Sequence, residues 1–309
     1  MRSSTTTTPA TDGTPLFVRT WLPDDEPVAL VQLAHGMAEH SARYEPLARD
    51  LTDAGYAVWI HDHRGHGETS ARREDHGYFA DGDGWGTVVE DLHTVAGAAR
   101  GAHPGLAHFL VAHSMGSLLG RDYVSRHGQE LAGAAFSGTG GDPGALGRAA
   151  QVVARLEARL RGRRHPSPLM STLVLGPYNK RFAPARTDVD WLSRDDEVVD
   201  AYVADPRCGE TCTSGFYADL LGGVNGLGAR VSRVPRDLPV YFFSGSEDPV
   251  GGRAVEAVAQ SFTDAGVQDV TCRIYEGARH EVLNETNRDE VVADLVTWLD
   301  AHRERVASR

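Results

Sequence analysis

This sequence of 309 residues has few cysteines, a single lysine and no long apolar run. Its three cysteines, Cys208, Cys212 and Cys272, are too few for a disulfide framework, which favours a reducing cytoplasm as the compartment. No apolar stretch reaches the ~20 residues that a membrane-spanning helix needs. The segment from Met1 to Gly13 is rich in Ser and Thr and has no apolar part, so we expect a polar tail without a secretory signal.

Basic charge is also scarce. The chain carries 43 acidic and 31 basic residues, a formal net charge of -12, whereas a nucleic-acid-binding protein needs cationic surface to neutralise phosphates. We therefore expect no nucleic-acid partner. The hydrophobic fraction of 41% is that of an ordinary globular protein, and the length allows a large core.

Apolar strand patterns alternate with helical patterns through most of the chain, which predicts a mostly parallel sheet with helices on both faces. We expect an edge strand over 16–21 and a second edge strand, with alternating pattern, over 270–275. The buried strands are expected at 28–34, 56–60, 109–112, 132–137 and 239–244, and the helices at 44–54, 88–99, after 114 to about 127, at 253–265 and from about 287.

The alternation fails between residues 138 and 236. This stretch holds Gly/Pro punctuation and a helical segment over 149–161, and only 173–175 resembles a buried strand. We predict a main α/β domain formed by 1–137 and 237–309, with 138–236 as a cap inserted over the sheet. The cap contains a basic cluster, interpreted as a solvated face, with contact to an anionic head group or membrane surface as the alternative: Arg155, Arg159, Arg161, Arg163 and Arg164.

A serine stands at a predicted strand-to-helix turn. Ala112-His113-Ser114-Met115-Gly116 has small residues at its first and last positions, which allow the tight turn of a nucleophile elbow. The usual first residue of that pattern is glycine, and here it is Ala112. The flanking His113 and Gly116 are therefore supporting residues of a candidate nucleophile, Ser114.

Two further loops supply the partners that such a serine requires. Asp248 follows the strand expected at 239–244, and His280 follows the strand expected at 270–275. Because the carboxyl ends of parallel strands share one sheet edge, Ser114, Asp248 and His280 can meet there. Their order along the chain is the one that the nucleophile-elbow fold uses, and it predicts a catalytic triad.

Acyl transfer also needs hydrogen-bond donors for the negative oxygen of the transition state. The Met115 amide begins the helix after Ser114, and a second amide is expected from Met37. Gly36 precedes Met37 and lets the backbone come close. Glu39 and Arg43 lie four residues apart, and we expect them to form an ion pair that braces this loop.

With these residues in place, the sequence resembles the monoacylglycerol lipase/lysophospholipase group of α/β-hydrolases. The resemblance rests on five motifs in order: His35-Gly36-Met37-Ala38-Glu39-His40-Ser41 with Arg43-Tyr44, Asp62 to Gly67, His113 to Gly116, Asp248-Pro249-Val250, and His280 to Glu285. It implies that Ser114 is the nucleophile, His280 the base and Asp248 the orienting acid, with the Met37 and Met115 amides as oxyanion hole. It also implies hydrolysis of a carboxylic ester of a small or lipid-like substrate, without metal or cofactor.

Other functions use the same residues. The triad could pass the acyl group to another acceptor, as an acyltransferase or thioesterase does, and a non-catalytic ligand-binding protein could retain the fold. A peptidase would need a carboxylate for the substrate amino terminus. The histidines and aspartate of 62–67 suggest a metal site, but we favour a structural turn. Cys208 and Cys212 are too few for a zinc site and are expected to pack as small apolar residues.

Overall fold

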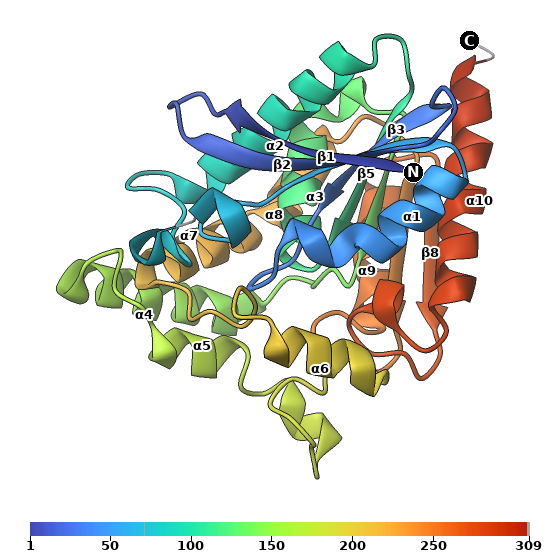
Figure 1. Cartoon of the computed structure of the whole chain (residues 1–309). Coiled ribbons are helices and arrows are strands. Elements are labelled where there is room, and N and C mark those ends of the chain that lie inside the picture. Colours follow the sequence, from blue (N-terminus) through green and yellow to red (C-terminus); the bar gives the residue numbers. More distant parts are fainter. Residues whose placement is uncertain (71, 308–309) are drawn as a thin grey trace.

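An eight-stranded sheet forms the centre of the protein (Figure 1). The computed structural model describes residues 1–70 and 72–307. The strands are β1 (Arg2–Pro9), β2 (Pro15–Leu22), β3 (Ala29–Ala34), β4 (Tyr56–His61), β5 (His108–His113), β6 (Gly133–Ser137), β7 (Val240–Gly245) and β8 (Val270–Tyr275). Their order in the sheet is β1-β2-β4-β3-β5-β6-β7-β8. The strands from β3 to β8 pair in parallel, and β1 and β2 add an antiparallel edge.

Helices cover both faces of the sheet, as the sequence predicts. One face packs against α1 (Glu45–Asp53) and α10 (Arg288–Ala307), which bury Leu47, Leu51, Leu295 and Leu299 in a shared core. The opposite face packs against α2 (Gly84–Ala102), α3 (Met115–His127) and α9 (Ala254–Asp264). Each strand buried on both faces reads as a continuous apolar run for this reason.

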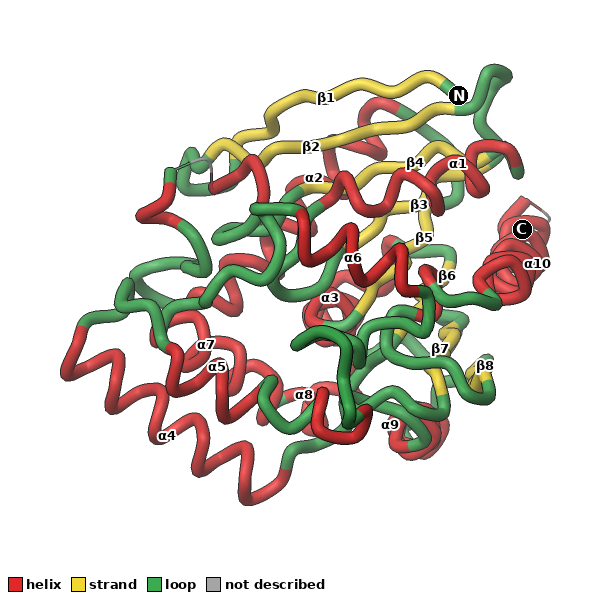
Figure 2. Tube along the Cα trace, turned by 60° about the horizontal axis from the view of Figure 1, so that its bottom comes forward, coloured by secondary structure: helices red, strands yellow, loops and turns green. Residues whose placement is uncertain are grey.

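The chain leaves the sheet after β6 and returns to it with β7. The elements between are α4 (Gly144–Arg161), α5 (Pro168–Val174), α6 (Asp196–Ala204), α7 (Ser214–Asn225) and α8 (Leu227–Arg230). Helices α4, α5 and α6 all lie beyond the same end of the sheet, with α4 and α5 side by side and α6 apart from them (Figures 1 and 2). Phe216 and Tyr217 on α7 are fully buried in the same core as α2 and α3, so this part of the segment packs directly against helices that cover the sheet.

Three sequence predictions are wrong at the level of single elements. The expected polar tail contains β1, and the expected edge strand over 16–21 is therefore an interior strand, β2, between β1 and β4. Strand β1 is exposed over nearly its whole length, so it lacks an apolar pattern, but its threonines are good strand formers. Residues 173–175 end α5 and form no strand.

Among the described residues, no helix combines the length and the apolarity that crossing a membrane requires.

Candidate active site

Ser114 occupies a strained turn between β5 and α3. Its backbone angles are φ 53° and ψ -121°, in a region that residues with a Cβ rarely adopt. Gly116 packs against the end of β3, where an added Cβ would lie 2.3 Å from the Ala34 carbonyl oxygen. Position 112 lies within β5, and its alanine is buried without such a conflict. The turn therefore requires glycine two residues after the serine and accepts alanine two residues before it.

The three residues expected to converge do so. His280 Nε2 lies 2.8 Å from Ser114 Oγ, and His280 Nδ1 lies 2.9 Å from Asp248 Oδ1. Asp248 also accepts hydrogen bonds from the Ser244 hydroxyl at 2.7 Å and the Val250 amide at 2.8 Å. Because the carboxylate is held by these donors, it fixes the imidazole with Nδ1 protonated and Nε2 free to accept the serine proton.

The surroundings of Asp248 and His280 favour a charged aspartate beside a basic imidazole. Burial by itself raises the pKa of Asp248, but the adjacent His280 and the two hydrogen-bond donors outweigh it and lower the pKa to about 2. Burial likewise lowers the pKa of His280, and the Asp248 carboxylate outweighs that effect, so the net shift is upward from 6.5. The pair can therefore stabilise a proton on His280 Nε2 during a reaction.

His280 is held by contacts that the sequence did not predict. The Trp191 ring packs 5.0 Å from the His280 ring, and the Trp191 carbonyl accepts a hydrogen bond from the His280 amide at 3.3 Å. Gly138 adopts φ 58°, and a Cβ there would lie 2.9 Å from His280 Cε1. Both neighbours come from the segment 138–236, where the sequence pattern is irregular, so no periodic signal marks them.

His113 precedes the serine and supports the histidine. Its ring lies 4.7 Å from the His280 ring, and its Nδ1 lies 3.3 Å from Ser137 Oγ. Burial and the neighbouring His280 lower the pKa of His113 to about 4. It is therefore a neutral packing partner at pH 7.

The loop after β3 passes directly beside Ser114. A Cβ built on Gly36 would lie 3.2 Å from Ser114 Cβ and 2.7 Å from Glu39 Oε1. Glu39 Oε1 accepts hydrogen bonds from the Gly36 amide at 2.5 Å and the Tyr44 hydroxyl at 2.9 Å. Glycine at position 36 thus lets the backbone that carries Met37 come close to the serine. The amide of Met115 belongs to the first turn of α3, whose N–H groups lack partners within the helix.

Arg43 links this loop to the loop that carries His280. The predicted ion pair with Glu39 is present, with 2.6 Å between Arg43 Nη1 and Glu39 Oε2. Arg43 also donates two hydrogen bonds of 2.8 Å to Glu281, the residue after the histidine. Burial raises the pKa of Glu281, but Arg43 outweighs burial and lowers it to about 2. The second partner, Glu281, is not apparent from the sequence because it lies 238 residues away.

The turn of residues 62–67 is built by its aspartate. Asp62 accepts hydrogen bonds of 2.7 Å from the amides of Ser41 and Glu68. His61, His63 and His66 are fully buried, and burial lowers the pKa of each ring well below 6.5. These contacts account for the turn as a structural element beside the candidate site.

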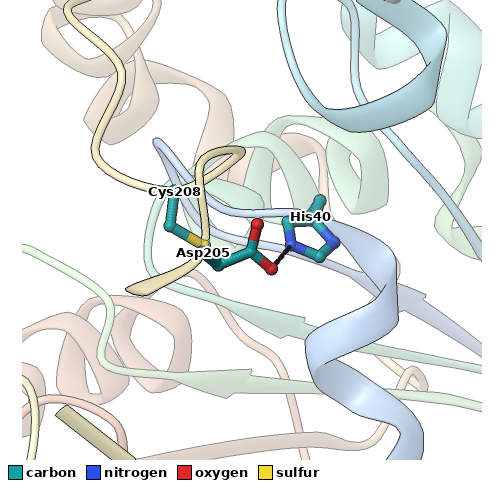
Figure 3. A group of neighbouring side chains, drawn as sticks. All are labelled: His40, Asp205 and Cys208. Atoms are coloured by element: carbon teal, nitrogen blue, oxygen red, sulfur yellow. Dashed lines mark hydrogen bonds and ion pairs between the residues drawn. The ribbon is translucent and has the colours of Figure 1, made fainter. Parts of the chain in front are cut away.

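Within residues 1–70 and 72–307, two groups of side chains bring possible metal-ligand atoms close together. One ligand atom from each of His40, Asp205 and Cys208 lies within 4.8 Å of the other two (Figure 3). However, His40 Nδ1 accepts a hydrogen bond from the Ala42 amide at 3.3 Å, which places the ring proton on Nε2, and Nε2 donates it to Asp205 at 2.8 Å. A histidine that binds a metal through Nε2 keeps its proton on Nδ1 and donates it to a nearby acceptor, whereas Nδ1 of His40 is itself an acceptor. This group therefore fits a hydrogen-bonded pair better than a metal site.

The second group lies at the far end of α3. It contains His93, His127 and Glu130. The two rings are stacked 3.9 Å apart at 11°, so their nitrogen lone pairs run side by side and do not converge on one point. Arg100 already pairs with Glu130 at 2.7 Å. The donor geometry does not fit a metal here either.

A mostly parallel sheet with a serine at a strand-to-helix turn, hydrogen-bonded to histidine and through it to aspartate, defines an α/β-hydrolase. A family model described as serine aminopeptidase, S33, matches residues 25–287. The chain belongs to this family.

Several curated relatives of this chain are named as lipases, and one similar solved structure is an esterase. The chain is 30% identical over 298 residues to the monoacylglycerol lipase of Mycolicibacterium smegmatis, covering 94% of both proteins. It is 32% identical over 292 residues to the monoglyceride lipase of Homo sapiens, covering 89% of this chain and 82% of that protein. A thermostable carboxyl esterase from Bacillus coagulans, solved with glycerol, superposes with a TM-score of 0.90 at 27% identity over 98% of this chain and 99% of that one. The resemblance to monoacylglycerol lipase-like α/β-hydrolases is confirmed.

Proposed function

We propose that the protein hydrolyses carboxylic esters of lipid-like substrates through an acyl-enzyme. The observation that carries this proposal is the continuous hydrogen-bonded chain from Ser114 Oγ through His280 to Asp248. Ser114 is the nucleophile, His280 the general base and acid, and Asp248 the group that orients the imidazole. The Met37 and Met115 amides form the oxyanion hole, supported by the position of Gly36 beside Ser114.

The reaction proceeds in two halves. Ser114 Oγ attacks the ester carbonyl carbon while His280 Nε2 takes the serine proton, and the carbonyl oxygen becomes an oxyanion facing the two amides. When the tetrahedral intermediate collapses, the C–O bond to the alcohol breaks and His280 returns the proton to the leaving alcohol. Water then attacks the acyl-enzyme with His280 again as base, which releases the acid and restores Ser114.

The relatives favour a single acyl chain on glycerol as the substrate class, and the sequence motifs described above add lysophospholipids as candidates. Both curated relatives described above are named for monoacylglycerol, and the matching esterase structure holds glycerol. Residues 138–236 act as the cap over the site, and the three free cysteines support a cytoplasmic location. Product analysis with competing alcohols and thiols distinguishes this hydrolase from an acyltransferase or thioesterase.

A peptidase function, which the family description suggests, is disfavoured by the charges beside the serine. An aminopeptidase needs a free carboxylate for the substrate ammonium. Glu39 and Glu281 both pair with Arg43. Glu210 in the cap is buried, and burial raises its pKa to about 8, so it is mostly uncharged at pH 7. These three carboxyl groups therefore offer no free negative charge for a substrate ammonium, which favours a neutral ester as the substrate.

The outer surface of the cap supports transient contact with an anionic lipid surface. Apolar side chains project from α4 and α5 into solvent, with Leu146 exposed by 81% and Leu160 by 74%; the others are Val152, Val153, Leu156, Leu169 and Leu173. The exposed charges of α4 are all arginines, at positions 148, 155, 159 and 161, whereas Glu157 is buried. Exposed apolar residues flanked by arginine are typical of helices that lie in a lipid interface.

Vesicle sedimentation tests that contact. Val152→Asp with Leu160→Asp is expected to weaken binding to vesicles containing anionic lipid, and to lower turnover of vesicle-borne monoacylglycerol more than turnover of a soluble short-chain ester. Val28→Asp is the matched control, because Val28 is also an exposed valine but precedes β3 at the opposite end of the sheet. Equal vesicle binding by all variants would refute the contact and leave the hydrolase proposal intact.

Ester hydrolysis by purified protein tests the central proposal. Acyl esters from short to long chains, including monoacylglycerol and lysophospholipid, should be cleaved without added metal or cofactor. Ser114→Ala and His280→Ala should each lower kcat by several orders of magnitude. Fluorophosphonate labelling that disappears in Ser114→Ala excludes a non-catalytic binding protein. Activity within about tenfold of wild type in either variant would show that the triad is wrong.

A further inference from the structure

A cap segment, residues 202–209, forms hydrogen bonds to the loop after β3, which carries the Met37 amide. We call residues 202–209 the latch segment and residues 35–41 the oxyanion loop. The Ala38 carbonyl accepts two hydrogen bonds from it, one from the Tyr202 hydroxyl at 2.9 Å and one from the Gly209 amide at 2.9 Å. Ala38 directly follows Met37. The Ala38 carbonyl oxygen, within the oxyanion loop, is therefore held by two donors from the latch segment.

A third contact joins the same two segments. His40 Nε2 donates to Asp205 Oδ2 at 2.8 Å, and His40 is almost fully buried (Figure 3). Asp205 accepts a further hydrogen bond from the Arg207 amide at 2.9 Å. Burial raises the pKa of Asp205, but the hydrogen bonds from Arg207 and His40 outweigh burial and hold its pKa well below the usual range. The carboxylate therefore stays ionised and keeps accepting from His40.

The loop needs this support because its backbone is strained. Ala38 has φ 57°, in the left-handed region that residues with a Cβ disfavour. Such a conformation persists only where surrounding contacts over-determine it. The two donors at the Ala38 carbonyl and the His40–Asp205 pair flank the Met37 peptide on its C-terminal side and supply those contacts.

We propose that the latch segment is a positioning element of the oxyanion hole, with Tyr202 and Asp205 as its positioning residues. The proposal rests on the hydrolase function above. Oxyanion donors accelerate a reaction because they are aimed before the charge develops, and a small displacement of a donor loses much of that effect. The latch segment fixes Ala38 and His40, and through them the direction of the Met37 amide. The cap thus contributes to the chemical step as well as covering the site.

Single substitutions separate this role from a purely structural one. Tyr202→Phe removes the hydroxyl but keeps the ring over Arg43, which lies 4.9 Å from the ring centroid. Asp205→Asn keeps an acceptor for His40 and removes the charge. Asp200→Asn is the matched control: it makes the same chemical change on α6, but Asp200 pairs with exposed Arg186 and not with the oxyanion loop.

The expected result is a loss of transition-state stabilisation. Tyr202→Phe and Asp205→Asn should each lower kcat for a soluble short-chain ester roughly tenfold with KM nearly unchanged. The affinity for a trifluoromethyl ketone, which forms an oxyanion adduct with the serine, should fall by the same factor. Asp200→Asn should leave both values at the wild-type level.

Three outcomes would overturn the proposal: kcat within twofold of wild type in both variants, a change confined to KM, or an equal loss in Asp200→Asn. Each of these outcomes compares a variant with a wild-type enzyme that hydrolyses esters, so it refutes the latch proposal without refuting the proposed function. That function fails if wild-type protein cleaves no ester, or if Ser114→Ala retains the activity.

Discussion

Replacing Arg43 by methionine should reveal the ion-pair bridge between the loop after β3, which carries Glu39, and the loop after β8, which carries His280 and Glu281. Arg43 is 12% exposed, and its partners Glu39 and Glu281 are 4% and 5% exposed. Removing the guanidinium leaves two buried carboxylates without their cation, and breaking a buried pair in this way costs about 3–5 kcal/mol. With an unfolding entropy of about 2.1 cal/mol/K per residue, that loss lowers Tm by about 5–8 °C.

The Glu45–Arg49 ion pair of α1 provides a matched control. Arg49 pairs with Glu45 at the same four-residue spacing, but both side chains are more than half exposed, at 58% and 53%. Exposed pairs contribute about 0–1 kcal/mol, so Arg49→Met should barely change Tm. Differential scanning calorimetry at pH 7 measures both variants. A Tm loss in Arg43→Met no larger than in Arg49→Met would refute the reasoning.

The pH dependence gives a second measurement on the same variant. The folded-state pKa of Glu281 is lowered from 4.5 to about 2, so in wild type its contribution to stability is present above about pH 4.5 and is lost as pH falls toward 2. Without Arg43, burial is the dominant influence and raises that pKa, so protonation then relieves a buried charge. The stability gap between wild type and Arg43→Met, measured by urea unfolding, should therefore narrow from pH 7 to pH 5. A gap that stayed constant would contradict this assignment.

Further predictions concern the triad and the glycines that pack against it or its turn. Asp248→Asn should lower kcat by about 10⁴-fold, and in wild type kcat/KM should fall as the pH drops through a pKa above 6.5, because only neutral His280 accepts the serine proton; a pH-independent rate would argue against this base. Gly138→Ala places a Cβ 2.9 Å from the His280 ring at φ 58°, so activity should fall at least tenfold while most of the fold is retained, as circular dichroism would show. Gly116→Ala places a Cβ 2.3 Å from the Ala34 carbonyl oxygen and should reduce soluble expression or Tm sharply; normal stability would show that the turn can relax.

The buried parts of the fold could be predicted because burial on both faces leaves a plain trace in sequence. Strands such as β4 and β7 are continuous apolar runs, and the amphipathic α1 ends at Asp53, just before Gly55, which adopts φ 89°. Strand β1 is missing from the prediction because it is solvated, and only its pairing with β2 makes it a strand. Propensity without an apolar face gives too weak a signal.

The candidate site also contains residues that could be predicted from the sequence and residues that could not. Ser114, Asp248 and His280 were found because each follows a strand, and parallel topology brings strand ends together. The supports Trp191, Tyr202 and Asp205 could not be found this way. They lie in a segment with no repeating pattern, and they act by contacts across more than eighty residues of chain. Such pairings are products of tertiary packing and leave no local mark in the sequence.

The placement of His280 has a consequence for refolding. Its partners lie in four separate stretches of chain: the serine 166 residues away, the acid 32 residues away, Gly138 and Trp191. Contacts of such long sequence separation form late, after loop closure has been achieved. Recovery of esterase turnover after dilution from denaturant therefore marks the end of folding, and it should lag behind the return of helical circular dichroism.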